Sequence, residues 1–176
     1  MRRPGLTPRV FLPLFSFVFL SDFASKRVAV DRLSPAYIPH DVFGDVLRFT
    51  LAYNVRAAMG MTAGSNSRWI LAGIAMVMLS AVLVWLRRTK SEDPILFSGM
   101  ALVAAGALGN LVDRLRWDRG VVDFIDVGVG ATRFWIFNVA DMAITIGAAL
   151  LWLAMRQRPH GPGGNGSPSG VAEAMD

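Results

Sequence analysis

Residues 134–155 read FWIFNVADMAITIGAALLWLAM, an apolar run whose only charged residue is Asp141. About 20 predominantly apolar residues can cross a bilayer as a helix, so this run predicts a membrane-spanning segment. A carboxylate at hydrocarbon depth costs roughly 2.5 to 3.5 kcal/mol on insertion scales and normally faces a bundle interior or a cavity. We therefore expect Asp141 to meet a polar partner. The nearest upstream acid is Asp123, in the segment VVDFI at 121–125, and Asp22 is a third acid in an apolar stretch.

The composition of the chain is that of a membrane protein. Of its 176 residues, 53% are hydrophobic and 18% are charged, and the mean hydropathy is +0.44. The absence of cysteine excludes disulfides, a thiolate nucleophile and cysteine-ligated metals. Only two histidines, His40 and His160, are available for a Ser-His-Asp triad or a zinc site. Carboxylates, hydroxyls and two lysines remain as candidate reactive groups.

The positive charge of the chain points to lipid head groups. The net charge is +5 and the pI is about 10.7. The arginines flank the apolar segments and do not form one stripe with interleaved aromatic residues, which favours anionic lipids over nucleic acid as partners.

Four apolar stretches predict a single membrane domain over residues 1–158. They are 10–30, 69–86, 94–112 and 134–155, and an even number of crossings puts both termini on one side of the membrane. Similar numbers of Lys and Arg on the two sides leave the orientation undecided. Residues 159–176, rich in Gly, Pro and Ser, predict a disordered tail.

The first stretch follows three arginines and could instead be a secretory signal. Asp22 and Lys26 interrupt its apolar run, and no A-x-A-like cleavage site follows, so we favour a retained helix. The two residues are four apart, with the acid nearer the N-terminus, and this order predicts a same-face ion pair that pins the helix near the interface.

The connection over residues 31–68 is too long for a simple turn and is a candidate functional element. Within it, Leu47, Phe49, Leu51 and Tyr53 alternate with other residues at the period of a half-buried strand. We predict a small sheet at the membrane surface.

The third stretch combines a packing pattern with a polar end. Ala101, Ala105 and Gly109 recur every fourth residue, which predicts close approach of another helix. The sequence GNLVDR at 109–114 then brings an amide, an acid and a guanidinium together within a few residues.

Four blocks of the sequence resemble lipoprotein signal peptidase, the bacterial signal peptidase II family of membrane aspartic endopeptidases. The blocks are DFASK at 22–26, NVRAAM at 54–59, GALGNLVDR at 106–114 leading to VVDF at 121–124, and FNVAD at 137–141. They stand in the family's order and, with the four spans, cover the chain except for its tails.

The resemblance implies an all-α integral membrane protein with four transmembrane helices and a small extracytoplasmic β-sheet in the 31–68 loop. It also implies residence in the bacterial cytoplasmic (inner) membrane, with both termini in the cytoplasm and the active site near the extracytoplasmic face. The matching positions assign catalysis to Asp123 and Asp141. They assign substrate binding to Asn54, Asn110, Arg114 and Asn138, and structural support to Asp22, Lys26 and Asp113.

The implied activity is removal of the signal peptide from diacylglyceryl-modified prolipoproteins, by cleavage before the lipidated cysteine. The implied partners are these prolipoproteins, membrane lipids and globomycin-type inhibitors, with no metal, no cofactor and no nucleic acid. One block departs from the family pattern, because Arg56 stands where glycine is usual and Met59 where phenylalanine is usual. Arg56 removes a permissive backbone position, whereas Met59 is a mild change.

Two aspartates that share one proton can hydrolyse a peptide bond, because one acts as acid and the other as base. Three other interpretations remain open from the residues alone. A proton-coupled carrier would use the intramembrane carboxylates as a relay, although no repeated pair of broken spans is present. A Ser-Lys peptidase is disfavoured because Ser25 and Lys26 are neighbours in the chain. Alternatively, Asp141 is a purely structural hydrogen-bonding group between helices.

Overall fold

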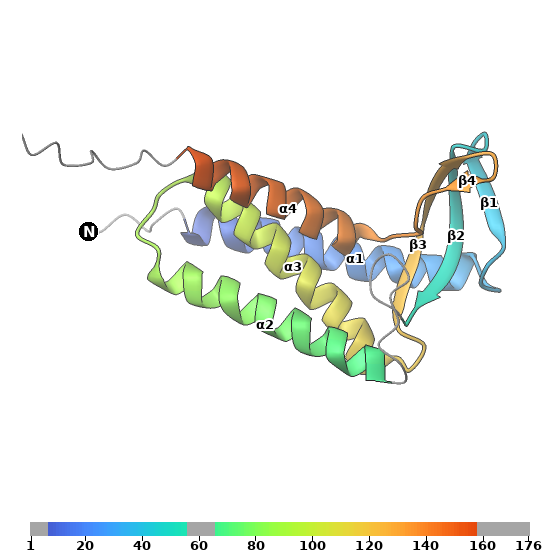
Figure 1. The fold of residues 1–176 in the computed structure, drawn as a ribbon, viewed down its shortest axis with the longest axis horizontal. Helices are drawn as coiled ribbons and strands as arrows, with labels where there is room; N and C mark the ends of the chain where they lie inside the picture. The colour runs from blue at the N-terminus through green and yellow to red at the C-terminus, as the bar shows by residue number, and fades with distance from the viewer. Residues whose placement is uncertain (1–6, 56–65, 158–176) are drawn as a thin grey trace, which may run out of the picture.

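The computed structural model describes residues 7–55 and 66–157, and these residues form a bundle of helices with a small sheet at one end (Figure 1). In chain order the elements are the π-helical turn η1 (Thr7–Phe11), α1 (Leu12–Arg32), β1 (Pro39–Phe43), β2 (Leu47–Asn54), α2 (Ser67–Arg88), α3 (Pro94–Arg116), β3 (Val121–Val129), β4 (Thr132–Arg133) and α4 (Val139–Arg156). Arg56, Met59 and the predicted tail over 159–176 lie outside the described residues.

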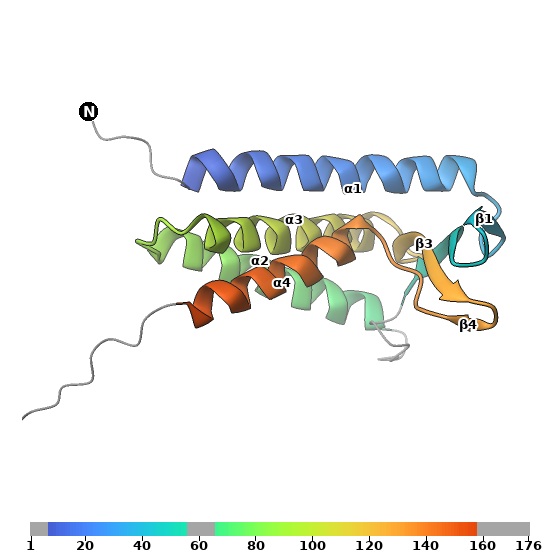
Figure 2. The ribbon, with the colours of Figure 1, turned by 90° about the horizontal axis from the view of Figure 1, so that it is seen from above.

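Three of the described helices, α2, α3 and α4, are long and apolar enough to cross a membrane. Helix α1 is of similar length, 21 residues, but its second half carries Asp22, Lys26, Arg27, Asp31 and Arg32. It runs beside α3 along the length of the bundle (Figure 2). The fold of the described residues is therefore mostly helical with a small sheet. That α1 also crosses the membrane stays a prediction.

Helix α3 lies between α1 on one side and α2 and α4 on the other (Figure 2). Its small side chains permit this arrangement. A Cβ added to Gly106 would lie 2.4 Å from the Ala140 carbonyl oxygen of α4, and one on Gly109 would lie 2.4 Å from Asp22 Oδ2 of α1. Ala101 and Ala105 are fully buried. The packing role predicted for Ala101, Ala105 and Gly109 is confirmed.

The sheet is antiparallel with the strand order β1-β2-β3-β4. The strand predicted around Leu47 to Tyr53 is confirmed as β2, whereas β3 was not predicted. In the pairing of β2 with β3, Ala52 lies opposite Asp123 and Tyr53 opposite Val122. Gly120 enters β3 with a φ of 88°, and a Cβ there would lie 2.3 Å from the Asn54 carbonyl oxygen. A glycine at this turn therefore lets the end of β2 approach the start of β3.

The start of α4 corrects the sequence analysis. The helix begins at Val139, not at Phe134, because the preceding residues are extended and Phe137 bridges to Ile125 of β3. Asn138 caps the helix: its side chain accepts from the Asp141 N–H, and the Asp141 side chain accepts from the Asn138 N–H. This reciprocal arrangement is a capping box. Asp141 consequently lies in the first turn of α4, at the sheet end of the bundle, and not in the middle of a span.

Candidate active site

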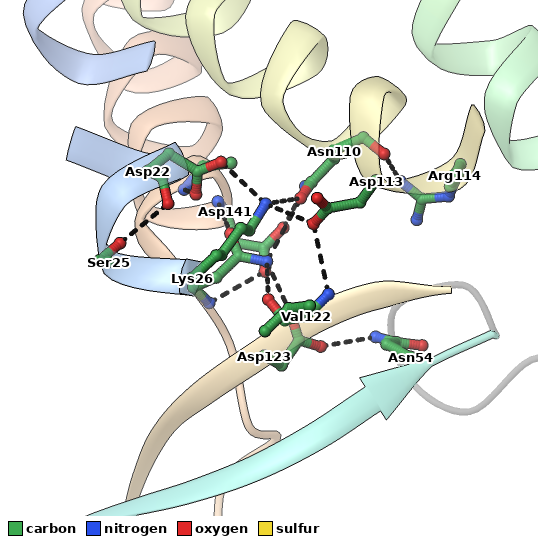
Figure 3. A network of polar contacts seen from close by, with 12 residues as sticks. Asp22, Ser25, Lys26, Asn54, Asn110, Asp113, Arg114, Val122, Asp123 and Asp141 are labelled. Atoms are coloured by element: carbon green, nitrogen blue, oxygen red, sulfur yellow. Dashed lines mark hydrogen bonds and ion pairs between the residues drawn. The ribbon is translucent and has the colours of Figure 1, made fainter. Parts of the chain in front are cut away.

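Asp123 lies near the start of β3, where the sheet meets the helical bundle (Figure 3). Only 2% of its surface is exposed. Its Oδ2 accepts a hydrogen bond of 3.0 Å from Asn54 Nδ2 of β2, and its Oδ1 accepts one of 2.6 Å from Asn138 Nδ2. The Asp123 carboxylate is therefore held by Asn54, at the end of β2, and by Asn138, which caps α4.

Asp141 is half-buried in the first turn of α4. Its Oδ1 accepts a hydrogen bond of 2.8 Å from Asn110 Nδ2 of α3, and its Oδ2 accepts the Asn138 backbone N–H at 3.2 Å. Asn138 thus bonds both acids, through its side chain to Asp123 and through its backbone to Asp141. The polar partner that the sequence predicted for Asp141 is found in these two asparagines.

Both aspartates line one cavity of about 890 Å³, which lies between the sheet and α4. Asn54, Asn110 and Arg114 also line it. Arg114 is half-buried and donates from Nη1 to the Asn110 carbonyl oxygen at 3.1 Å. Asn138, the fourth predicted substrate-binding residue, does not line the cavity, and 0% of its surface is exposed. It lies behind the aspartates, where it contacts them and not the cavity.

The cavity has an apolar wall that the sequence analysis did not identify. Phe134, Trp135, Met142 and Ile146 line it and are exposed large hydrophobic residues. Two of them, Phe134 and Trp135, come from the segment before α4, for which the sequence predicts helix. The signal that could have found this segment is Asn138 followed three residues later by Asp141, a spacing typical of a helix N-terminus.

The environment of Asp123 changes its electrostatics. Burial, as the larger cause, and the charge of Asp141 together raise the pKa of Asp123 to about 7, against the hydrogen bonds from Asn54 and Asn138 and the charge of Lys26, which lower it. The pKa of an ordinary aspartate is about 3.9. Asp123 can therefore hold a proton near neutral pH.

The three predicted supporting residues form one buried cluster beside the aspartates. Lys26 Nζ lies 2.8 Å from Asp22 Oδ2 and 3.0 Å from Asp113 Oδ2, so the predicted pairing of Asp22 with Lys26 is confirmed. No group of three or more His, Cys, Asp or Glu side chains suited to a metal ion occurs within residues 7–55 and 66–157.

Comparisons with known proteins agree on one family. Residues 14–157 match the family model described as signal peptidase (SPase) II. The chain is 42% identical over 153 residues to the lipoprotein signal peptidase of Pseudomonas aeruginosa, covering 85% of this chain and 89% of the relative. It is 36% identical over 163 residues to that of Nitratidesulfovibrio vulgaris, covering 92% and 98%.

The fold has solved counterparts. A bacterial membrane enzyme determined by the in meso method at 2.3 Å resolution superposes with a TM-score of 0.77 and 26% identity, over 99% of each chain. A second, determined by the same method at 1.9 Å resolution, has a TM-score of 0.76 and 27% identity, over 90% of this chain and 99% of its own.

Proposed function

The chain belongs to the signal peptidase II family, and from this membership we propose that it removes the signal peptide of diacylglyceryl-modified prolipoproteins by cleaving before the lipidated cysteine. The family is one of bacterial integral membrane proteases, which leaves the proton-coupled carrier without support. The observation that carries the catalytic proposal is that Asp123 of β3 and Asp141 of α4 line the same cavity and share Asn138 as a hydrogen-bonding partner.

In the proposed mechanism Asp141 is the base and Asp123 is the acid. Asp141 is the more exposed of the two and takes a proton from a water molecule, whose oxygen attacks the scissile carbonyl carbon. Protonated Asp123 donates a hydrogen bond to the carbonyl oxygen as negative charge develops there. Asp141 then passes its proton to the leaving nitrogen and the C–N bond breaks. Each proton transfer by a positioned group contributes typically about 10² to 10⁴-fold.

The remaining polar groups have distinct proposed roles. Asn54, Asn110 and Arg114 face the cavity and hold the peptide backbone of the substrate. Asn138 is enclosed behind the aspartates and positions them. The apolar wall of Phe134, Trp135, Met142 and Ile146 is suited to a substrate that carries acyl chains.

The proposed setting is the cytoplasmic (inner) membrane, with the sheet and cavity at the extracytoplasmic face and both termini in the cytoplasm. Asp141 is the third residue of α4, and at about 1.5 Å per residue it lies within roughly 5 Å of the helix start. That depth is reachable by water and matches the cleavage site of a lipid-anchored protein. Globomycin-type inhibitors are expected to compete for this cavity.

Cleavage of a purified diacylglyceryl prolipoprotein, followed by its gel mobility shift, tests the proposal. Asp123→Asn and Asp141→Asn should each lower kcat at least about 10²-fold, because Asp141→Asn removes the base that transfers the proton and Asp123→Asn removes the acid that stabilises the developing negative charge. Globomycin should block the wild-type shift. Asp126→Asn is the matched control, since Asp126 is a buried acid of the same strand whose partners are Thr50 and Arg133. A folded Asp123 or Asp141 variant with normal turnover would remove that residue from the mechanism.

A further inference from the structure

Lys26 has a buried ammonium group in which each donor has a partner. The residue is 4% exposed, and its Nζ lies 2.8 Å from Asp22 Oδ2, 3.0 Å from Asp113 Oδ2 and 3.0 Å from Asn110 Oδ1. A lysine ammonium has three N–H donors and no acceptor. The three contacts therefore use its full capacity, and they link α1 to two positions on α3 (Figure 3).

The two carboxylates that Lys26 bridges each reach the backbone beside one proposed catalytic acid. Asp22 Oδ1 accepts the Ala140 N–H at 2.8 Å, one residue before Asp141. Asp113 Oδ2 accepts the Val122 N–H at 3.3 Å, one residue before Asp123. Lys26 thus connects Asp22, which hydrogen-bonds the first turn of α4, to Asp113, which hydrogen-bonds the start of β3.

The third contact of Lys26 fixes the orientation of an amide. Asn110 Oδ1 accepts from Lys26 Nζ and also from Asn138 Nδ2 at 3.2 Å. With two donors directed at this oxygen, the amide cannot flip without placing its NH2 against them. Asn110 Nδ2 is consequently held toward Asp141 Oδ1, to which it donates at 2.8 Å.

We propose that Lys26 is a positioning residue that sets the relative placement of Asp123 and Asp141, and not merely an ion-pair tie between α1 and α3. The inference rests on the proposed function, because it assigns Lys26 to the same site. Without the ammonium, Asp22 and Asp113 become two neighbouring buried carboxylates that repel each other. Their separation moves the first turn of α4 relative to β3. The placement of Asp22 over α3 depends on Gly109, where a Cβ would lie 2.4 Å from Asp22 Oδ2.

Two variants separate positioning from structural support. Lys26→Arg keeps the charge but replaces a compact ammonium by a planar fork that cannot reproduce the three contacts. The double variant Lys26→Met/Asp113→Asn removes one positive and one negative charge, so the net charge of the cluster is unchanged. Arg27→Met is the matched control, since Arg27 is the next residue of α1, is exposed, and pairs only at 3.7 Å with Asp31 among its described contacts.

The measurements are kcat, KM, the pH profile of kcat/KM and Tm on the full chain with diacylglyceryl prolipoprotein. We expect both variants to lose about 10²-fold in kcat, the size of effect that a misplacement of about 1 Å produces, while KM changes less than about threefold. In Lys26→Arg the alkaline limb of kcat/KM should move to lower pH, because a more distant Asp141 raises the pKa of Asp123 less. The other charged groups near Asp123 include Lys26 of α1 and, on α3, Arg114 and Asp113. The single variant Lys26→Met, which leaves Asp22 and Asp113 without a cation, serves as the reference for Tm. The double variant should have a higher Tm than this reference but should not regain kcat.

The outcomes for these variants support or overturn the positioning role of Lys26. A folded Lys26→Arg protein with wild-type kcat and pH profile overturns the inference, as does a double variant that regains kcat together with Tm. If Lys26→Arg does not fold, the double variant still gives the answer. A wild-type chain that leaves the prolipoprotein uncut overturns the proposed function and this inference with it, whereas active wild-type and active Lys26 variants overturn this inference alone.

Discussion

At the residue scale, the pH dependence of activity should report the proton on Asp123. Burial and the charge of Asp141 raise the pKa of Asp123 to about 7, so the side chain is protonated below that pH and ionised above it. The proposed mechanism needs the protonated form. We therefore expect kcat/KM, which reports the pKa values of the free enzyme, to fall about tenfold per pH unit above about 7, measured with prolipoprotein at concentrations below KM.

Asn54→Ala tests whether Asp123 is the acid. Asn54 donates to Asp123 Oδ2, and this hydrogen bond lowers the pKa of Asp123 by stabilising the ionised form. Its removal should raise that pKa and move the alkaline limb of kcat/KM to higher pH. A limb that moves to lower pH, or activity that still rises at pH 9, would contradict Asp123 as the acid.

Single residues could be predicted where placing a charge in an apolar segment is energetically costly, or where their spacing predicts a contact. The cost of a carboxylate in an apolar run identified Asp141, and the four-residue spacing identified the pairing of Asp22 with Lys26. The backbone N–H groups of Val122 and Ala140 donate to Asp113 and Asp22. Their role could not be predicted from the sequence, because every residue except proline has a backbone N–H. The dual role of Asn138 follows only once the start of α4 is known.

At the element scale, the close approach of α3 and α4 should control activity as well as stability. A Cβ on Gly106 would lie 2.4 Å from the Ala140 carbonyl oxygen, so Gly106→Ala must push the first turn of α4 away from α3 and carry Asp141 with it. We expect a Tm several degrees lower and a kcat at least about tenfold lower, measured by thermal unfolding and prolipoprotein cleavage.

The matched control is Gly73→Ala on α2, where an added Cβ meets nothing within 4 Å. Alanine is about 0.5–1 kcal/mol more favourable than glycine in a helix interior, so this variant should be at least as stable as the wild type. Equal effects of the two substitutions would show that helix propensity, and not the contact between α3 and α4, governs the result.

Elements were predictable where the bilayer dictates their composition. The apolar runs located the helices because about 20 apolar residues are needed to cross the hydrocarbon core. The same rule misplaced the start of α4, since Phe134 to Phe137 continue the apolar run although they are extended against β3. Strand β3 was missed because its partner β2 is distant in the sequence, and such pairing leaves little trace in a local pattern.

At the scale of the whole molecule, the sheet and the cavity lie at one end of the bundle. The start of α1, the connection between α2 and α3, and the end of α4 lie at the other (Figure 1). Because α1 spans the same two ends as the other helices, we expect it to cross the membrane with them. The charges in its second half distinguish it from α2, α3 and α4. Charge counting could not orient the chain because arginines flank both ends of the helices.

Cysteine accessibility tests this topology, because the chain has no cysteine of its own and each introduced thiol is unique. We choose exposed positions: His40 on the sheet, Glu92 between α2 and α3, Leu12 at the start of α1 and Gln157 after α4. His40→Cys should react with a membrane-impermeant maleimide in intact spheroplasts. Glu92→Cys, Leu12→Cys and Gln157→Cys should react only after permeabilisation, since an impermeant reagent cannot reach the cytoplasmic face. Reaction of Leu12→Cys in intact spheroplasts, with Glu92→Cys still protected, would show that α1 does not cross and that the polar cluster around Lys26 is presented from the outer surface.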